Sequence, residues 1–346
     1  MKKVTSQDVA ARAGVSQSAV SLILNESDKV LFNEETKQRV VQAALDLGYE
    51  LPKRKKRTPS SRTGILLLFT PTLNNPFYAE LVQTVESYAD SCGYCVIVCN
   101  TLRKPELEKY YLDTFLKTRV DGMIFTFLPS FPEIVEHVAD SVPSVLIGEK
   151  RAEQPICSIE LSNEHAGKIL SEHLYALGHR KFLFVSTPFN QLTLARQQRL
   201  EGIRAFLRAQ GLGEDSLELL ASEAQTETDS LPDAMPYEYA VGRRLMGQAL
   251  EHGVKATAII GVNDMTAIGL LRAARRAGVR VPDDLAVVGF DDIAFASYVV
   301  PTLTTIAQPT TAMGERAMDM ALALAGGAEA CPRRHVVMPG RLIVRE

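Results

Sequence analysis

Side chains that could act as nucleophiles, metal ligands or general bases are scattered through this 346-residue sequence. Cys92-Gly-Tyr-Cys95 has the C-x-x-C spacing of a zinc or redox site, and Cys99 follows closely. A zinc site needs a fourth ligand and a knuckle-like turn, whereas Cys95 and Cys99 stand in a β-branched run. We therefore expect buried thiols and no metal, with a metal or redox site as the alternative.

The sequence also lacks the common enzyme motifs. It has no G-x-G-x-x-G after its first strand-like segment, no phosphate-binding loop, no G-x-S-x-G and no H-E-x-x-H. Its six histidines do not cluster with a nucleophile. We expect a protein that is not an enzyme and needs no cofactor, and an α/β enzyme stays as an alternative.

Charge is distributed unevenly along the chain. Residues 1–62 hold 12 Lys and Arg against 7 Asp and Glu, whereas the remainder holds 26 against 34. This pattern indicates that only the N-terminal part meets a polyanion. The run Lys53-Arg54-Lys55-Lys56-Arg57 predicts several phosphate contacts with a strong salt dependence, and a merely solvated tether is the alternative.

Length and hydrophobicity set the broad class. A chain of 346 residues favours two or three domains. The longest apolar runs are strand-length and far too short to span a membrane. The N-terminus lacks the apolar core of a signal peptide, so we expect a cytoplasmic protein without a membrane partner.

The first fifty residues predict three short helices. Thr5 caps the first helix with an acidic residue three positions later, and Gly14 ends it. Ser16 caps the second helix, residues 17–24, and small residues let the two helices cross closely. The third helix, capped by Asn33, should bury Val40, Val41, Ala44, Leu45 and Leu47. This pattern is typical of a helix-turn-helix, and an all-helical domain without a DNA role is the alternative.

Beyond Gly64 the sequence alternates between strands and helices. Ile65–Phe69 is a continuous apolar strand, Pro76 begins a helix, and a second set of such elements begins near Asn163. This alternation predicts two doubly wound parallel sheets with a ligand between them, and residues 335–344 should form one closing strand.

These features divide the chain into three parts. Residues 1–50 should form the helix-turn-helix domain, 51–62 a basic linker and 63–346 the ligand-binding and dimerisation core. The core should contain a first lobe of about 63–161 and 292–325, and a second lobe of about 162–291 and 326–346.

The head of the chain resembles the lactose/galactose repressor (LacI/GalR) family. The matching residues are Val4-Thr5-x-x-Asp8-Val9-Ala10-x-x-Ala13-Gly14-Val15-Ser16-x-x-x-Val20-Ser21-x-x-x-Asn25. Further family landmarks occur in the expected order at 71–78, 119–122, 177–180, 199–202, 263–269, 281–284, 289–292 and 301–305. The resemblance implies an N-terminal all-α helix-turn-helix domain followed by an α/β two-lobed core like that of periplasmic binding proteins.

The resemblance implies that the helix from Gln17 enters the major groove. Gln17 suits adenine and Ser18 is permissive, whereas Leu22 could only touch a thymine methyl group. The expected DNA-binding residues are Thr5, Ser16, Gln17, Ser18, Ser21, Leu22, Asn25, Lys53, Arg54, Lys55, Lys56 and Arg57.

The linker departs from the family pattern. Members usually have a hinge helix whose leucine wedges into the minor groove. Here no leucine follows Pro52, and Pro59 would stop a helix. We therefore expect a flexible basic linker that kinks the operator less than wedge-bearing relatives do.

In the family, an effector lies between the lobes. The resemblance implies the effector-binding residues Asn75, Phe77, Tyr78, Arg199, Asn263 and Asp291. Rings would pack on a sugar or base, while Asn, Asp and Arg would hydrogen-bond hydroxyls or a carboxylate. Helix core is the alternative for Phe77, and a cross-cleft salt bridge is the alternative for Arg199 and Asp291.

Two departures bear on the effector. Gly148-Glu149 stands where members often have Asp-Arg, and Ser162 stands where they often have Asp before Asn. The loss of these acids extends the expected effectors from a neutral sugar to a sugar acid or phosphate.

We expect a sequence-specific transcriptional regulator, in the first instance a repressor, controlled by that small molecule. It should bind a palindromic operator in double-stranded DNA as a homodimer, because one reading helix covers only a half-site. A two-lobed carbohydrate-binding protein without a regulatory role is the other alternative, although the basic head argues against it.

Overall fold

The structure, a computed structural model, describes residues 4–24, 32–47, 49, 62–138, 142–150, 156–189, 193–223, 235–326 and 335–346. The chain forms two compact units, Met1–Lys56 and Arg57–Glu346. Within the described residues, no helix is long and apolar enough to cross a membrane.

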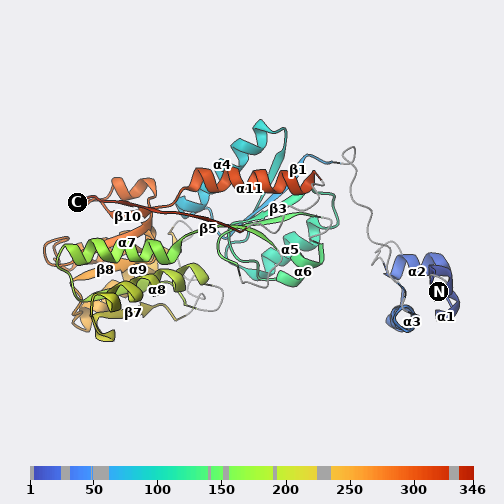
Figure 1. Ribbon diagram of the computed structural model, residues 1–346, viewed down its shortest axis with the longest axis horizontal. Helices are drawn as coiled ribbons and strands as arrows, with labels where there is room; N and C mark the ends of the chain where they lie inside the picture. The colour runs from blue at the N-terminus through green and yellow to red at the C-terminus, as the bar shows by residue number, and fades with distance from the viewer. Residues whose placement is uncertain are drawn as a thin grey trace. The chain divides into compact units, whose positions relative to one another are not determined.

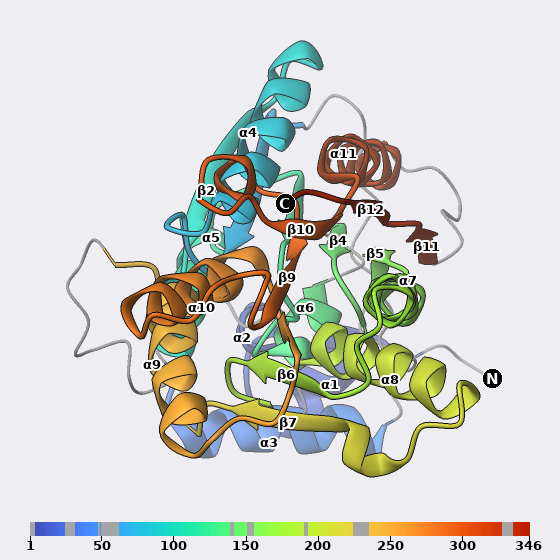
Figure 2. The same cartoon turned by 90° about the vertical axis from the view of Figure 1, so that its left-hand side faces the viewer.

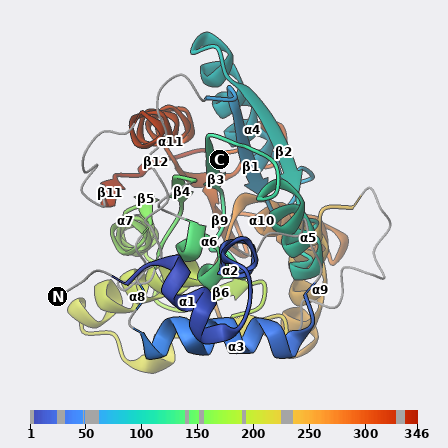
Figure 3. The ribbon, with the colours of Figure 1, turned by 90° about the vertical axis from the view of Figure 1, so that its right-hand side faces the viewer.

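The first unit contains three helices around a small apolar core (Figure 3). They are α1 (Ser6–Ala13), α2 (Gln17–Leu24) and α3 (Glu34–Asp46). The core consists of Val9, Ala10, Ala13, Val20, Ile23, Val40, Ala43 and Ala44, with Leu47 packed against it. Val41 was expected to be buried but is 46% exposed, because it lies about 100° around α3 from Val40, beyond the edge of the face that packs into the core. The side chain of Leu45 lies outside the description.

The first lobe of the second unit is a parallel sheet between two pairs of helices (Figure 1). The strand order is β11-β5-β4-β3-β1-β2. The strands are β1 (Ile65–Thr70), β2 (Cys95–Asn100), β3 (Gly122–Phe125), β4 (Ser144–Ile147), β5 (Cys157–Leu161) and β11 (His335–Met338). Helices α4 (Pro76–Ser91) and α11 (Thr310–Ala325) cover one face, and α5 (Pro105–Phe115) and α6 (Pro132–Val138) cover the other. This double cover explains why β1 is apolar throughout.

The second lobe repeats the arrangement (Figure 2). Its strand order is β12-β10-β9-β8-β6-β7, parallel except for β12. The strands are β6 (Phe182–Ser186), β7 (Leu217–Ala221), β8 (Ala258–Gly261), β9 (Ala286–Asp291), β10 (Thr304–Ala307) and β12 (Arg341–Ile343). Helices α7 (Asn163–Ala176) and α8 (Leu194–Ala209) cover one face, and α9 (Tyr237–Glu251) and α10 (Asp264–Arg276) cover the other. Short 3-10 helices occur at η2 (Glu214–Ser216) and η4 (Ala294–Ser297).

The expected division between the lobes is wrong in two places. β10 was assigned to the first lobe but pairs with β9 and β12 in the second sheet. β11 was assigned to the second lobe but pairs with β5 in the first sheet.

The single closing strand expected over 335–344 is therefore two strands in different sheets. Pro339 has no N–H to continue the ladder. Gly340 passes so close to β10 that a Cβ there would lie 2.7 Å from Ile306 Cγ2. Because these residues stop pairing and permit close approach, the chain crosses from one lobe to the other here.

Candidate functional site

The turn between α1 and α2 is formed by the residues expected from the sequence. The Asp8 amide donates to Thr5 Oγ1 (3.4 Å), and the Thr5 amide donates to the Asp8 carboxylate (2.8 Å), which makes a capping box. Gly14 ends α1 in the left-handed region at φ 66°, and the Ala19 amide donates to Ser16 Oγ (3.1 Å). Two crossed helices joined by so short a turn can present α2 to a groove.

Thr5 is exposed at the start of α1, and Ser16, Gln17 and Ser18 are exposed at the turn and the start of α2. The Gln17 amide nitrogen donates to Ser6 Oγ at 2.8 Å, which orients the side chain at the start of α2. Recognition of adenine by both ends of the Gln17 amide would require this bond to break. The side chains of Ser21 and Leu22, Asn25, and the basic run from Lys53 to Arg57 lie outside the described residues.

In the second unit, a cavity of about 490 Å³ lies between the two lobes. The first lobe contributes the loop after β2, the residues after β3 and the residues after β4, and the second lobe contributes the first turn of α8 and the start of α9. Aromatic side chains in the wall are Tyr78, Phe127 and Tyr237. The volume lies within the usual range for small-molecule sites.

An ion pair beside the cavity joins one lobe to the other. Arg103, between β2 and α5, contacts the carboxylate of Glu238 in the first turn of α9. Their side chains are only 12% and 5% exposed, so water screens the pair weakly. The same carboxylate accepts a bond from Asn75 Nδ2 at 3.2 Å. Glu238 therefore ties the second lobe to two elements of the first.

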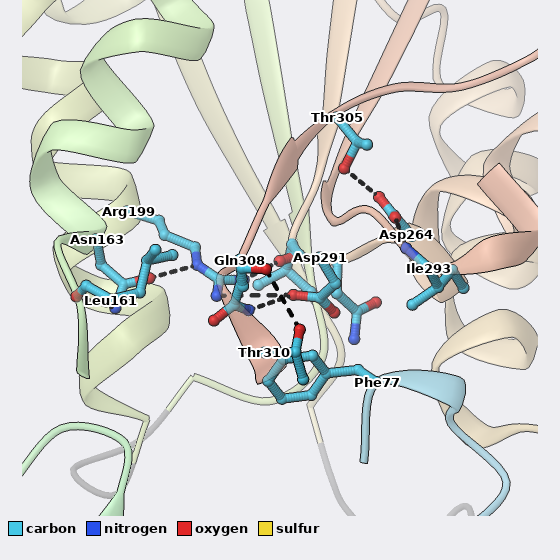
Figure 4. Close-up of polar contacts among 12 residues, drawn as sticks. Phe77, Leu161, Asn163, Arg199, Asp264, Asp291, Ile293, Thr305, Gln308 and Thr310 are labelled. Carbon is cyan, nitrogen blue, oxygen red and sulfur yellow. Dashed lines mark hydrogen bonds and ion pairs between the residues drawn. The ribbon is translucent and has the colours of Figure 1, made fainter. Parts of the chain in front are cut away.

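A second polar network runs beside the cavity (Figure 4). Asn163 donates to Glu149 of the first lobe and accepts from Arg199 Nε at 2.7 Å. Arg199 lies 3.9 Å from Asp291 and stacks on the Phe290 ring. Asp291 accepts from Gln308 Nε2 at 2.6 Å, at the point where the chain crosses from β10 to α11. The network therefore connects both lobes with a crossing segment.

Backbone strain occurs where these networks begin. The non-glycine residues with positive φ in the described chain are Leu102 (51°), Arg103 (60°), Asp291 (117°) and Asp292 (55°). Leu102 and Arg103 follow β2, whereas Asp291 is the last residue of β9 and Asp292 follows it. Such conformations cost free energy and are retained where the surrounding structure fixes a functional side chain. Here the left-handed backbone directs the side chain of Arg103 toward Glu238, and the strained backbone at Asp291 directs its side chain toward Arg199.

The residues expected to bind an effector take different positions. Tyr78 lines the cavity. Asn75 is buried beside it, where it caps α4 by accepting from the Phe77 amide (3.1 Å) as well as contacting Glu238. Phe77 packs partly into the core of the first lobe and lies near Thr310 in Figure 4.

The remaining three candidates lie in the second lobe. Arg199 and Asp291 are brought together, at 3.9 Å, in the network described above. The Asn263 side-chain oxygen instead caps α10, accepting from the Thr266 amide (2.9 Å) and hydroxyl (2.8 Å). That contact leaves its amide nitrogen as the group able to meet a ligand.

Four charged residues at or beside the cavity were not singled out from the sequence as ligand-binding residues: Arg103, Glu149, Arg196 and Glu238. Arg196 lies one helical turn before Arg199, a spacing that could have indicated a shared face. No local signal identifies Glu238, because its partners Asn75 and Arg103 are distant in the sequence.

Burial changes the ionisation of the acids near the cavity. It raises the pKa of Glu149 to about 7, against the opposing charge of Arg199. Burial likewise raises the pKa of Asp291 to about 6, again opposed by Arg199. Glu149 and Asp291 can therefore gain or lose a proton near neutral pH.

The described cysteines do not form a cluster with other side chains that could bind a metal. Among the described cysteines, Cys99 and Cys157 are buried, and burial raises the pKa of the Cys99 thiol to about 12. Cys92 and Cys95 were expected to be buried but are exposed, because Cys92 lies at the C-terminal end of α4 and Cys95 begins β2, the edge strand of its sheet. The described part of the chain contains no group of three or more metal-binding side chains.

Comparison with known proteins agrees with this architecture. Residues 5–51 match the family model for bacterial regulatory proteins, lacI family, and residues 171–346 match that for a periplasmic binding protein-like domain. The chain is 28% identical to the HTH-type transcriptional regulator DegA of Bacillus subtilis, over 99% of this chain and 97% of DegA. It is 30% identical to the HTH-type transcriptional repressor CytR of Escherichia coli, over 92% of this chain and 89% of CytR. The solved complex of the transcriptional regulator CelR with cellobiose matches with a TM-score of 0.72 at 26% identity, covering 99% of each chain.

A helix-turn-helix head and a two-lobed ligand-binding core define a DNA-binding transcriptional regulator modulated by a small molecule. This chain belongs to the lacI family of bacterial regulatory proteins. The resemblance, fold class and regulatory function expected from the sequence are thus confirmed.

Proposed function

We propose that this regulator is a repressor whose affinity for its operator changes when a sugar, sugar acid or phosphorylated small molecule binds between the lobes. One observation carries the proposal: both lobes form the wall of the 490 Å³ cavity. A ligand that contacts both lobes binds the closed and open arrangements differently, and this difference is what shifts an equilibrium. CytR, which is named a repressor, and CelR, solved with cellobiose, support the assignment by similarity.

The effector residues we propose combine the sequence candidates with the structural ones. Asn75, Phe77, Tyr78, Arg199, Asn263 and Asp291 remain the candidates from the sequence, and Arg103, Glu149, Arg196 and Tyr237 join them from the cavity. Aromatic rings with a few fixed polar groups suit a hydroxylated ring. Glu149 retains a carboxylate near the position where the sequence suggested that an acid was lost.

On DNA, we propose a homodimer on a palindromic operator. One α2 helix covers a half-site, so two-fold symmetry provides the second. Thr5, Ser16, Gln17, Ser18, Ser21, Leu22 and Asn25 are the proposed contacts of the head, and Lys53, Arg54, Lys55, Lys56 and Arg57 those of the linker. The family comprises transcriptional regulators, and we propose that the chain has no enzymatic activity and acts in the cytoplasm, where its DNA lies.

Fluorescence anisotropy with the full chain tests this proposal. Genomic fragments selected at low salt should share a palindromic sequence. A sugar or sugar derivative should change the affinity of the protein for that sequence at least about tenfold, a typical allosteric coupling. If no fragment binds at low salt, the proposed DNA-binding role is wrong. Retention by a monomer on a half-site would remove the homodimer.

A further inference from the structure

Arg196 in the cavity wall has no ion-pair partner among the described residues, whereas the other arginines at the cavity do. Arg103 is paired with Glu238, and Arg199 lies 3.9 Å from Asp291. Arg196, which also lines the cavity, forms no ion pair with an acidic group of the described residues. Arg196 is partly buried, and because a cation removed from water is costly unless paired, this position calls for an anion.

The contacts of Arg196 are fewer than its donors. Within the described residues, the Arg196 side chain makes one hydrogen bond, in which Nη1 donates to the Pro188 carbonyl oxygen at 2.6 Å. A guanidinium has five N–H donors in a planar fork. Burial and the like charge of Arg103 lower the pKa of Arg196, and the charge of Glu238, which is already paired with Arg103, opposes this shift. The two arginines are therefore close enough to repel, as two groups converging on one anion would be.

The helix that carries Arg196 adds to the same field. Residues 193–196, the cap and first turn of the 16-residue helix α8, line the cavity. The N-terminus of a helix has partial positive charge and free-pointing N–H groups, which favour negative charge. Here the helix end and two arginines face one space.

Two of the three acids in the cavity wall, Glu108 and Glu149, already have protein partners. Glu108 accepts bonds from the Ser130 amide (2.9 Å) and hydroxyl (2.7 Å), and Glu149 accepts from Asn163. Glu106 lies exposed near the rim. An amine ligand would have to compete with these contacts, whereas an anion would complete those of Arg196.

We propose that Arg196, assisted by Arg103 and the first turn of α8, binds a carboxylate or phosphate group of the effector. The effector is then an acidic, hydroxylated molecule, whose ring lies against Tyr78, Phe127 or Tyr237. This inference rests on the proposed function, because it names the class of effector for the same cavity.

Ligand-induced changes in the melting temperature of the full chain provide the test. The probes are gluconate, galacturonate, glucose 6-phosphate, glucose and glucosamine, each at matched ionic strength. We expect at least one acid to raise the melting temperature of the wild type, with glucose and glucosamine much weaker. Response to the sugar acids identifies a carboxylate, and response to glucose 6-phosphate identifies a phosphate.

Arg196→Gln should weaken the binding of that acid at least about tenfold, the usual consequence of losing a charge-assisted bond. Arg208→Gln is the matched control, because Arg208 lies on the same helix with its side chain 64% exposed. This control should bind the acid like the wild type. Equal loss in both variants, stronger binding of a neutral sugar or amine, or no response to any acid would overturn the proposal.

A ligand-independent measurement guards against misfolding. If Arg196 serves a ligand, Arg196→Gln should leave the melting temperature of the unliganded chain unchanged or raise it, because an uncompensated cation is removed. A fall of several degrees would make Arg196 a structural residue and overturn the inference. Operator binding without ligand should persist in this variant, so failure of the inference is distinguishable from failure of the regulator assignment.

Discussion

Arg103 of the first lobe and Glu238 of the second form an ion pair between the lobes, and the guanidinium also lies 5.7 Å from the centre of the Tyr237 ring. The left-handed backbone at Leu102 and Arg103 directs the arginine toward this partner. A contact between lobes that lies in the cavity wall is sensitive to both lobe movement and ligand. We therefore expect this pair to link effector binding to the arrangement of the two lobes.

A double-mutant cycle should reveal strong coupling in this pair. Arg103→Met and Glu238→Gln should each destabilise the chain by about 3 kcal/mol, because each leaves one buried charge unpaired. The double variant should cost less than the sum, with a coupling energy of about 1–3 kcal/mol. Urea unfolding followed by circular dichroism measures these values.

The exposed pair Arg208 and Glu214, 3.5 Å apart with side chains 64% and 83% exposed, is the control for that cycle. Its coupling should stay below about 0.5 kcal/mol. Equal coupling in the two pairs would show that burial does not strengthen the contact between the lobes.

Because of Glu149, the free energy of unfolding should fall as the pH rises from acid toward neutral. The pKa of Glu149 in the folded chain is raised to about 7 from an ordinary value of 4.5. Its contribution to the free energy of unfolding is therefore fully present below pH 4.5 and is lost as pH rises through 7. Glu149→Gln resembles the protonated acid and should remove up to about 3 kcal/mol of this loss. Unfolding at pH 5 and pH 8 measures the difference.

Glu201→Gln, an exposed substitution on α8, should retain the wild-type dependence. An unchanged pH profile for Glu149→Gln would contradict the assignment of this effect to Glu149.

The contact between α7 and α8 should be intolerant of a single methyl group. A Cβ at Gly202 would lie 2.0 Å from the Glu164 carbonyl oxygen, so Gly202→Ala must push α8 away from α7. We expect destabilisation of about 1–3 kcal/mol and weaker effector binding, because α8 carries Arg196 and Arg199. Thermal unfolding and ligand titration check both effects.

Gly247→Ala on α9 provides the opposite expectation, since a Cβ there meets nothing within 4 Å. It should stabilise the chain by about 0.5–1 kcal/mol through helix propensity. Destabilisation by this control would refute the steric explanation for Gly202.

Gln17 should determine specificity at one base pair of each half-site. Gln17→Ala should weaken operator binding by about 1–3 kcal/mol and relax the preference at that position alone. Gln7→Ala, exposed on α1, should change binding little. Anisotropy titrations with single-base operator variants make the comparison, and uniform weakening across all variants would assign Gln17 to the phosphate backbone instead.

The basic linker should contribute to affinity rather than specificity. Replacing Lys53–Arg57 by alanines should reduce the slope of log affinity against log salt concentration by up to about 4–5 for each subunit, or about 9 for the dimer, near 0.9 for each lost phosphate contact. An unchanged slope would favour a solvated tether. A bending assay that finds a sharp kink at the operator centre would contradict the expectation of a less bent operator.

Sequence alone was sufficient for the local and repetitive features of this protein. The capping box of Thr5 and Asp8, the turn at Gly14 and the alternation of strands and helices depend on neighbours within a few residues. They predicted the head, the α/β core and the family. The resemblance to the family also named Tyr78, Arg199 and Asp291 as effector contacts, and this role stays a prediction.

Only the tertiary structure decided which distant side chains meet. Arg103 finds Glu238 across 135 positions of the chain, and Asn263 is used as a helix cap that its residue type alone did not reveal. The sheets to which β10 and β11 belong follow from pairing with strands far away in the sequence. Each of these outcomes depends on long-range packing, where burial and geometry select among partners that local patterns leave equivalent.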